Sequence, residues 1–325
     1  MGSLPDVVED CMGVLQLYSD GSVHRTTDID FNIPLVPNDS VLFKDYIYDP
    51  DLGLSLRVYQ PALPKGPPRK FPVLYYIHGG GFCLGSRDWP NCHNCCTRLA
   101  SGLDAIVLSP DYRLAPEHRL PSAMDDVYGS LRWLRDLGRA ERKQAGSGEE
   151  WLDGRVDYGR VYLLGDSSGG NIAHHMSVRL GSGPQELDPV RVRGYVLLAP
   201  FFGGIERTKS EEGPPEVMLN LEALDRFWRL SLPLGENRDH PISNPFGPSS
   251  PALDGLSLGP FLIMAGGREL LRDRVEEYAR RLAGMGKDVE YLEYEGEEHG
   301  FFTNDPYSEI GGRAMQAMKK FMRDH

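Results

Sequence analysis

Short apolar runs separated by longer amphipathic stretches recur along this 325-residue chain. Residues 41–48 and 54–59 alternate apolar with polar side chains, so we expect two strands joined by a turn and paired antiparallel. Residues 71–77 are almost continuously apolar, as in a central strand that is buried on both faces. Further strands are expected at 105–109, 160–164, 194–198, 261–264 and 289–293.

Amphipathic periodicity predicts helices between most of these strands. The expected helices span residues 91–103, 121–137, 172–180, 219–230, 272–285 and 309–323. Alternating strands and helices are typical of an α/β fold, in which helices cover both faces of a mostly parallel sheet. The length suits one large domain or two small ones, and our prediction is a single α/β domain over residues 1–325.

Residues 203–250 interrupt the alternation, because they are rich in glycine and proline and hold one predicted helix between two strands. The segment is longer than an ordinary crossover requires, so we expect an insertion that forms a lid. Phe227 and Trp228 in its helix either face a pocket or anchor the helix to the core, and the sequence leaves both readings open. Surface loops are expected at the proline-rich residues 61–70 and the polar residues 140–153.

Composition and charge narrow the classes of function. The formal net charge of −12 argues against a nucleic-acid surface and against nonspecific adhesion to anionic membranes. The five cysteines are odd in number and lack the regular spacing of a disulfide framework, so the simplest interpretation is a reduced, intracellular chain. The first residues lack the basic start and apolar run of a signal peptide, and no apolar run is long enough to span a bilayer.

The clearest chemical signal is the sequence G-D-S-S-G at residues 165–169. It lies between a predicted strand and a predicted helix, which is the setting of a nucleophile elbow of pattern G-x-S-x-G. Glycine lacks a Cβ, so the chain can turn sharply and present the hydroxyl of Ser167 at the tip of the turn. The N-terminus of the following helix favours negative charge that develops there.

A serine nucleophile requires a histidine base and an acid that orients it, and in this arrangement the acid and then the histidine follow the serine. His299 follows the predicted strand 289–293, from which a loop could carry it over the sheet edge. His174 and His175 lie on the helix that leaves the elbow, and His240 lies inside the predicted lid. We therefore predict that His299 is the base.

The predicted acid is Glu269, which follows the strand 261–264. It lies at the carboxyl end of that strand, where α/β folds place their functional residues. Its carboxylate would fix the tautomer of His299 and stabilise the imidazolium. Asp273 is the competing candidate, although an acid in the first turn of a helix is also explained by the helix dipole.

An oxyanion hole requires backbone N–H groups that point at one position. The sequence H-G-G-G-F at residues 78–82 follows a predicted strand upstream of the serine. Gly79, Gly80 and Gly81 can present consecutive amides without side chains in the way, and the amide of Ser168 is the predicted further donor.

Other candidate chemistry is weak. Cys92, Cys95 and Cys96 beside His93 are residue types that bind metals, but they fall in an amphipathic helix without a second ligand pair elsewhere. The glycine-rich runs match neither a dinucleotide fingerprint nor a phosphate-binding loop. We therefore predict no metal and no cofactor.

Three motifs together carry a resemblance to a known family: H-G-G-G-F at 78–82, D-Y-R-L-A-P-E-H at 111–118 and G-D-S-S-G-G-N at 165–171. With them, and over nearly all of its length, the chain resembles plant carboxylesterases of the hormone-sensitive-lipase-like branch of the α/β-hydrolases. The resemblance implies an α/β-hydrolase fold, a plant source, and a cytosolic location with the nucleus as a second compartment. It also implies that residues 1–40 contribute to the lid. We expect that lid to be helical, although residues 14–23 allow a strand pair turned at 19–22.

The same branch contains the gibberellin receptors, which have the fold but lack the catalytic histidine, so the presence of His299 favours an enzyme. The family usually has aspartate where this chain has Glu269. Together with F-F-G-G at 201–204 and R-F-W-R-L-S-L-P at 226–233, this glutamate makes the chain most similar to the carboxylesterases that hydrolyse strigolactones.

The predicted activity is hydrolysis of a small apolar ester or lactone by Ser167, His299 and Glu269. The expected partner is that small molecule, not a nucleic acid or a membrane, and the sequence does not specify an oligomeric state. Two alternatives stay open. One is a hormone receptor with a vestigial triad, and the other is a dehydratase that uses the same site for elimination.

Overall fold

The computed structural model describes residues 5–26, 29, 32–62, 69–143, 151–183, 186–217 and 219–325. Most of the loop expected at 61–70 and part of the one expected at 140–153 lie outside these residues. Helix α2, Ser122–Lys143, continues into the second of these segments, so the prediction of a loop from residue 140 was wrong. The last turn of α2 is largely exposed and polar, and it therefore lacks the apolar periodicity that reveals a helix.

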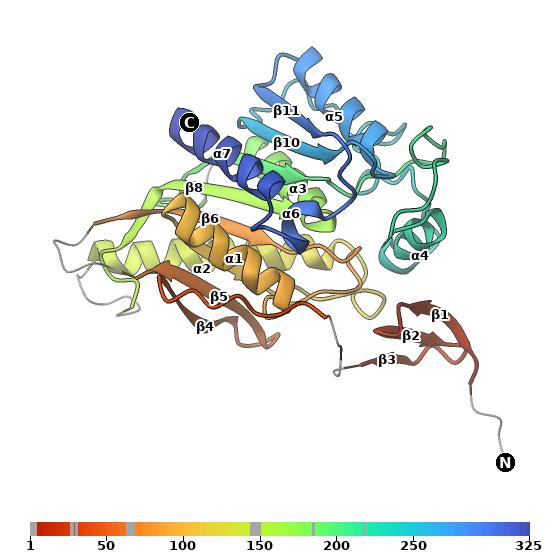
Figure 1. Ribbon diagram of the computed structural model, residues 1–325, viewed down its shortest axis with the longest axis horizontal. Coiled ribbons are helices and arrows are strands. Elements are labelled where there is room, and N and C mark those ends of the chain that lie inside the picture. The colour runs from red at the N-terminus through yellow and green to blue at the C-terminus, as the bar shows by residue number, and fades with distance from the viewer. Residues whose placement is uncertain are drawn as a thin grey trace.

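An eight-stranded sheet with the order β11-β10-β9-β8-β6-β7-β5-β4 forms the centre of the molecule (Figure 1). β5 pairs antiparallel with both β4 and β7, and the other neighbours are parallel. The antiparallel start and the mostly parallel sheet are thus confirmed. The strands are β4 Val41–Asp49, β5 Leu54–Pro61, β6 Phe71–Ile77, β7 Ile106–Pro110, β8 Val156–Asp166, β9 Val192–Leu198, β10 Phe261–Gly266 and β11 Val289–Tyr294.

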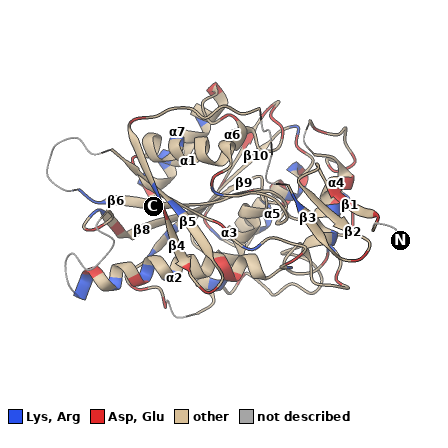
Figure 2. Cartoon of the chain, turned by 90° about the horizontal axis from the view of Figure 1, so that it is seen from below, with Lys and Arg blue, Asp and Glu red and all other residues tan. Residues whose placement is uncertain are grey.

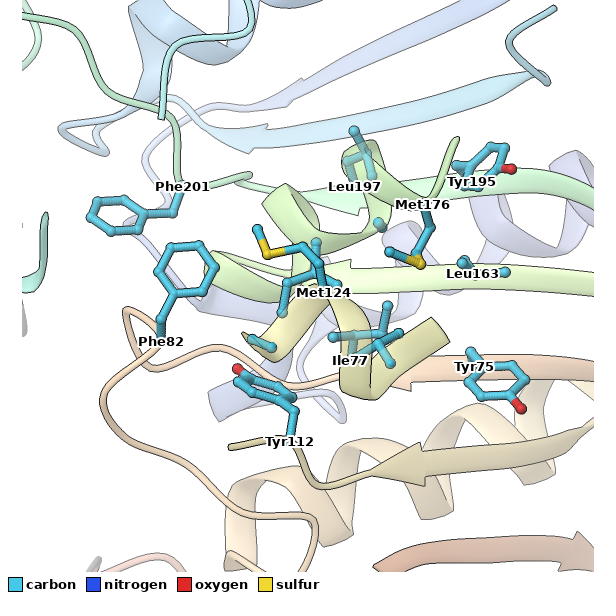
Figure 3. Packing of buried hydrophobic residues seen from close by; sticks show 14 of the residues in the cluster. Tyr75, Ile77, Phe82, Tyr112, Met124, Leu163, Met176, Tyr195, Leu197 and Phe201 are labelled. Carbon is cyan, nitrogen blue, oxygen red and sulfur yellow. The ribbon is translucent and has the colours of Figure 1, made fainter. Parts of the chain in front are cut away.

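Helices cover both faces of this sheet, as predicted. Alternate side chains of β6 enter two separate apolar clusters, because successive residues of a strand point to opposite faces. Tyr75 and Ile77 pack with α2, α3 and α5, and Figure 3 shows Met124 of α2 and Met176 of α3 in this cluster. Tyr76 packs in the other cluster with α1 and α7. The remaining helices are α1 Pro90–Leu103, α3 Ser168–Gly181, α5 Arg272–Gly284, α6 Phe301–Asn304 and α7 Glu309–Asp324.

The N-terminal segment forms a separate antiparallel sheet of β1 Val7–Cys11, β2 Leu15–Tyr18 and β3 Val23–Arg25. The strand pair allowed by residues 14–23 is therefore confirmed, and the expected helical form of this segment is wrong. Met12 and Gly13 both have positive φ, 56° and 69°, in the turn between β1 and β2. Such a turn matches the twist of a hairpin and not the continuation of a helix.

The insertion at 203–250 holds the helix α4, Leu221–Ser231, close to its predicted bounds. Figure 1 shows α4 and the N-terminal sheet together at one end of the molecule. Figure 2 shows acidic and basic residues in this region, and here the guanidinium groups of Arg226 and Arg229 pair with the carboxylate of Glu9 at 3.0 and 2.9 Å. Charged contacts thus fasten the N-terminal sheet to the insertion.

Within the part of the chain that the structure describes, no helix combines the length and the apolar character needed to cross a membrane.

Candidate active site

Ser167 stands between the end of β8 at Asp166 and the start of α3 at Ser168. Its φ of 54° and ψ of −115° are strained for a residue with a side chain, and strain of this kind is typical of functional turns. The surrounding backbone holds the conformation, because the N–H of Ser167 donates to the carbonyl oxygen of Leu198 at 2.8 Å. Its carbonyl oxygen accepts from the N–H of Phe201, also at 2.8 Å.

Glycine is required at the two ends of the elbow by close approach. A Cβ on Gly165 would overlap the backbone of Gly169, and a Cβ on Gly169 would overlap the carbonyl group of Ile77 at the end of β6. The elbow therefore packs directly on the neighbouring strand, and the predicted role of its glycines is confirmed.

Glu269 and His299 meet although they lie on different loops. The carboxylate Oε2 of Glu269, after β10, is 2.9 Å from Nδ1 of His299, after β11. The other oxygen of Glu269 accepts from the N–H of Gly266 at 3.1 Å. Asp273, the competing acid, instead pairs with Arg272 and accepts from a backbone N–H of the insertion. The structure thus brings together the pair that the sequence favoured.

The electrostatics of this pair are set by burial and by nearby negative charge. Burial raises the pKa of Glu269, against the opposing effect of its hydrogen bond to His299. Burial lowers the pKa of His299, but the hydrogen bond to Glu269 and the surrounding carboxylates outweigh it and raise that pKa to about 9. The carboxylates concerned are those of Glu269, Asp166 and Glu216.

The glycine loop lies beside the elbow. A Cβ on Gly79 would come within 3.2 Å of the Cβ of Ser167. Gly80 and Gly81 have positive φ, 112° and 60°, which glycine adopts without strain. Among the described residues, the amides of these three glycines donate to no backbone carbonyl, and the Ser168 amide opens a helix, where such groups have no partner in the helix. That these four amides form the oxyanion hole stays a prediction.

The motif at 111–118 holds the glycine loop in place through hydrogen bonds and ring stacking. The hydroxyl of Tyr112 donates to the carbonyl oxygen of His78 at 2.8 Å, and the two rings stack with centroids 4.3 Å apart. The carboxylate of Asp111 accepts from the N–H of Arg87 at 2.8 Å. Both contacts fix the backbone on either side of Gly79–Gly81 without entering the pocket.

A cavity of about 140 Å³ opens at the elbow and is lined by Ser167, His299 and all three glycines of the loop. Most of the remaining lining is apolar. It includes Phe201 and Leu84 from the main body, Leu219, Leu224 and Phe227 from the insertion, and Met12 from the N-terminal hairpin.

The two aromatic residues of α4 thus have different places. Phe227 lines the cavity, where a Cβ on Gly81 would overlap its ring. Trp228 is buried and stacks on Phe201 with centroids 4.3 Å apart, so it anchors the helix. Each of the two readings left open by the sequence is correct for one residue.

Ser167 and His299 share the cavity, but no hydrogen bond joins the serine hydroxyl to the imidazole ring in the described structure. In ligand-free enzymes such bonds are often long and tighten when the substrate binds. The arrangement supplies a hydroxyl at a strained turn, an imidazole oriented by a buried carboxylate, and several free amides, which are the parts needed for acyl transfer.

The remaining sequence candidates lie apart from this chemistry. Cys92, Cys95 and Cys96 are free and buried, and burial raises the pKa of the Cys92 thiol. Within the described residues, no group of three or more histidine, cysteine or acidic side chains is placed to hold a metal ion. Glu216 was not predicted from the sequence, because it carries no local pattern and reaches the site only through the tertiary fold. Met12 was expected only as part of the lid segment 1–40, and the structure places it in the cavity wall.

The comparisons with known proteins agree with this fold. A family profile described as the alpha/beta hydrolase fold matches residues 74–303. The chain belongs to the α/β-hydrolase family. The matched residues of this α/β-hydrolase run from β6 to α6, and they include the elbow, the glycine loop, Glu269 and His299.

Several named relatives of this chain are plant proteins. Tuliposide A-converting enzyme 2 of Tulipa gesneriana, a chloroplastic protein by its name, is 32% identical over 320 residues, or 98% of this chain and 79% of the tulip protein. The 3-O-acetylpapaveroxine carboxylesterase of Papaver somniferum is 37% identical over 287 residues, or 85% of this chain and 87% of the poppy protein.

Solved structures of esterases resemble this α/β-hydrolase closely. The thermostable carboxylesterase EstE1 from a metagenomic library has a TM-score of 0.73 and 29% identity, covering 89% of this chain and 90% of that one. An esterase of Pyrobaculum calidifontis has a TM-score of 0.71 and 29% identity, covering 90% and 86% of the two chains. Together with the plant relatives, these neighbours show that the chain is a carboxylic ester hydrolase.

Proposed function

We propose that this carboxylesterase works through a triad of Ser167, His299 and Glu269. The Ser167 hydroxyl attacks the ester carbonyl carbon while Nε2 of His299, the ring nitrogen that does not face Glu269, takes its proton. The protonated ring then gives the proton to the leaving alcohol, and an acyl-enzyme forms. Water, activated by the same ring, hydrolyses the acyl-enzyme and restores the serine. The observation that supports this most directly is the 2.9 Å contact between Glu269 and His299 at the wall of the cavity that holds Ser167.

The roles of the other groups follow from the same geometry. Glu269 keeps the proton on Nδ1, which leaves Nε2 as the acceptor, and its charge stabilises the imidazolium. The amides of Gly79, Gly80, Gly81 and Ser168 would bind the oxyanion of the tetrahedral intermediate, where one such donor is typically worth about 2.7–4 kcal/mol.

We propose a small apolar ester or lactone as the substrate class. The cavity is small and mostly apolar, which suits a short acyl or ring group next to the elbow. A strigolactone is our specific proposal, and its support is the sequence resemblance at Glu269 and at residues 201–204 and 226–233. Because a cavity of about 140 Å³ is below the usual size for a ligand of this kind, we expect the insertion or the N-terminal hairpin to open when it binds.

Replacement of the nucleophile tests the triad. We expect Ser167→Ala to lower kcat for p-nitrophenyl acetate by about 10⁴-fold or more, because no other group in the proposed triad can form the acyl-enzyme. Ser182→Ala, at the other end of α3, is the matched control and should keep full turnover. The melting temperature checks that both variants fold. Retained turnover in Ser167→Ala would refute the proposed nucleophile.

The substrate proposal is tested by single-turnover mass spectrometry with a strigolactone. Hydrolysis predicts an adduct on the protein followed by the split products. Intact bound ligand without products would favour a receptor, and loss of water from the ligand would favour elimination.

We also propose a cytosolic location for this chain. The support is that all five cysteines are free and buried, as suits a reducing compartment. Some tulip relatives are chloroplastic or amyloplastic by name, so imaging of a fluorescent fusion of the full chain in plant cells provides the test. Plastid signal alone would contradict the proposal.

A further inference from the structure

The insertion and the two loops that carry Glu269 and His299 meet at one side chain, that of Glu216. Its Oε2 accepts from the backbone N–H of His299 at 2.6 Å. Its Oε1 accepts from the backbone N–H of Leu270, the residue after Glu269, at 2.7 Å. A single carboxylate therefore bonds the loop of the proposed base and the loop of the proposed acid at the same time.

Further contacts hold Glu216 in this place. The N–H of Val217 donates to Oε2 of Glu298 at 3.2 Å, which attaches the insertion a second time to the loop of His299. The hydroxyl of Ser210 donates to the carbonyl oxygen of Leu270 at 2.7 Å, which attaches it a second time to the loop of Glu269. Two of these hydrogen bonds join the insertion to the His299 loop, and two join it to the Glu269 loop. Glu216 takes part in one bond to each loop.

The same segment leads directly into the wall of the cavity. The N–H of Glu216 donates to the carbonyl oxygen of Leu219 at 2.8 Å, and Leu219 lines the cavity. Asn220 then caps α4, whose Leu224 and Phe227 also line the cavity. Glu216 can hold the two loops only while this part of the insertion lies over the site.

The geometry of these bonds relates directly to the contact between acid and base. Charge-assisted hydrogen bonds from backbone amides to a carboxylate are short and directional. They fix the backbone of His299 itself and of the residue next to Glu269, and those backbones determine whether Nδ1 and Oε2 stay 2.9 Å apart. A displacement of about 1 Å in such groups can lower the rate about 100-fold.

We propose that Glu216 is a positioning residue that joins the insertion to the His299 and Glu269 loops, so that the base and the acid are aligned when the insertion covers the cavity. This inference rests on the triad of the proposed function. Glu216 does not itself line the cavity, and it acts on the base and the acid through the two backbone amides.

The charge of Glu216 provides a readout that a purely structural contact would lack. Three carboxylates act on the His299 ring from three elements: Glu269 after β10, Asp166 at the end of β8, and Glu216 in the insertion. Burial lowers the pKa of His299, and these groups together raise it above the ordinary value. The ring must be neutral to accept the serine proton, so activity is lost as the pH falls through this pKa. Removing one carboxylate should move that loss to lower pH.

The test compares Glu216→Gln, Glu216→Asp and the control Glu212→Gln in the full chain. Glutamine has the same shape but no charge, and its NH₂ group faces one of the two amides, so one bond is lost. We expect kcat for p-nitrophenyl acetate to fall about 10- to 100-fold with little change in KM, and the acid limb of the kcat/KM profile to move to lower pH.

The other two variants separate alignment from charge. Aspartate keeps the charge but is too short to reach both loops, so we expect Glu216→Asp to lower kcat about 10-fold while the acid limb shifts much less than in Glu216→Gln. Glu212 is exposed in the same insertion, and Glu212→Gln removes the same charge without touching either loop, so kcat and the pH profile should match the wild type.

Two results would overturn the inference. One is wild-type kcat and an unshifted pH profile in Glu216→Gln. The other is a loss of kcat in Glu216→Gln that is accounted for by a lower melting temperature, while the acid limb of its kcat/KM profile stays where it is in the wild type. Failure of the triad itself is detected separately, because it would appear as retained turnover in Ser167→Ala whatever the Glu216 variants do.

Discussion

At the scale of single residues, the main feature is a buried glutamate that reaches the histidine ring at 2.9 Å. The resemblance indicates aspartate as the usual residue at this place, yet the extra methylene of Glu269 is accommodated. Its second oxygen bonds the N–H of Gly266, so the longer side chain folds back on the end of β10. The side chain is fully buried, and its position is therefore fixed by packing as well as by hydrogen bonds.

The length of this side chain can be tested. Glu269→Asp withdraws the carboxylate by about 1.5 Å, one carbon–carbon bond, so its hydrogen bond to the ring is lost or lengthened. We expect kcat to fall about 10- to 100-fold, and Glu269→Gln, which cannot hold the correct tautomer, to cost about 10⁴-fold. Steady-state kinetics on p-nitrophenyl acetate provide the measurement.

Asp273→Asn is the matched control, because Asp273 was the competing acid in the sequence. It pairs with Arg272 and lies away from His299, so we expect kcat within about threefold of the wild type. A larger loss in Asp273→Asn than in Glu269→Gln would contradict the assignment of the acid.

Sequence predicted the candidate residues on the main body of the fold and offered Phe227 as a pocket residue of the lid, but it missed Glu216. Ser167, Glu269 and His299 each follow a strand of the sheet, where a local pattern of apolar run and loop reveals them. Glu216 sits alone in a proline-rich stretch, and only the folding of the insertion brings it to the backbones of His299 and Leu270. No spacing in the sequence encodes that contact.

At the scale of elements, too, features with a local sequence pattern were predicted, and features set by tertiary contacts were not. Strands buried on both faces and amphipathic helices were found close to their true bounds, since their periodicity reflects burial. The N-terminal segment was expected to be helical and is a small sheet, because its two turns and a few ion pairs decide its form. Arg226 of α4 illustrates this, since it pairs with Glu9 and donates to the carbonyl oxygen of Asp10 at 2.6 Å.

This attachment leads to a prediction about the hairpin. Arg226→Ala removes both contacts to β1 and should release the hairpin, whose Met12 lines the cavity. We expect KM for apolar esters to rise several-fold while kcat changes little, because the triad is not touched. Limited proteolysis should cut faster within residues 5–26.

Arg142→Ala is the control for the loss of an arginine. Arg142 lies at the exposed end of α2, where it pairs with Asp188 and not with a residue of the hairpin. It should leave both KM and the cleavage pattern unchanged. An Arg226→Ala protein with wild-type KM and wild-type proteolysis would show that other contacts hold the hairpin.

At the scale of the whole molecule, two apolar clusters on the faces of one sheet hold the fold together, and some polar groups lie inside them. The proposed mechanism does not use His174 and His175 on α3. The His174 ring is buried with Nδ1 2.7 Å from the hydroxyl of Tyr278, and Nε2 of His175 is 3.2 Å from the carbonyl oxygen of Ile242. Both rings are packed as neutral groups.

These rings predict how stability depends on pH. Burial lowers the pKa of His175 to about 4, and burial also lowers the pKa of His174 well below its ordinary value. Between about pH 4 and 6.5 these two rings therefore bind more protons in the unfolded chain than in the folded chain, so their contribution to stability is complete above that window and falls as the pH drops through it. We expect this contribution to lower the melting temperature from pH 7 to pH 5.

The variant His175→Gln keeps a donor for the carbonyl of Ile242 but cannot be protonated, so the difference in melting temperature between pH 7 and pH 5 should become smaller. His24→Gln, which removes an exposed imidazole on β3, should leave that difference as it is. An unchanged difference in His175→Gln would contradict the explanation.

The central claim is that Ser167 is the nucleophile of this carboxylesterase, and active-site labelling tests it most directly. The wild-type chain is treated with diethyl p-nitrophenyl phosphate, which phosphorylates an activated serine and then leaves it blocked. Peptide mass spectrometry locates the label while residual esterase activity is measured on the same samples. We predict one diethylphosphoryl group per chain, on the peptide containing Ser167, with activity falling in proportion to labelling. Label on another residue, or full activity in the labelled protein, would contradict the account.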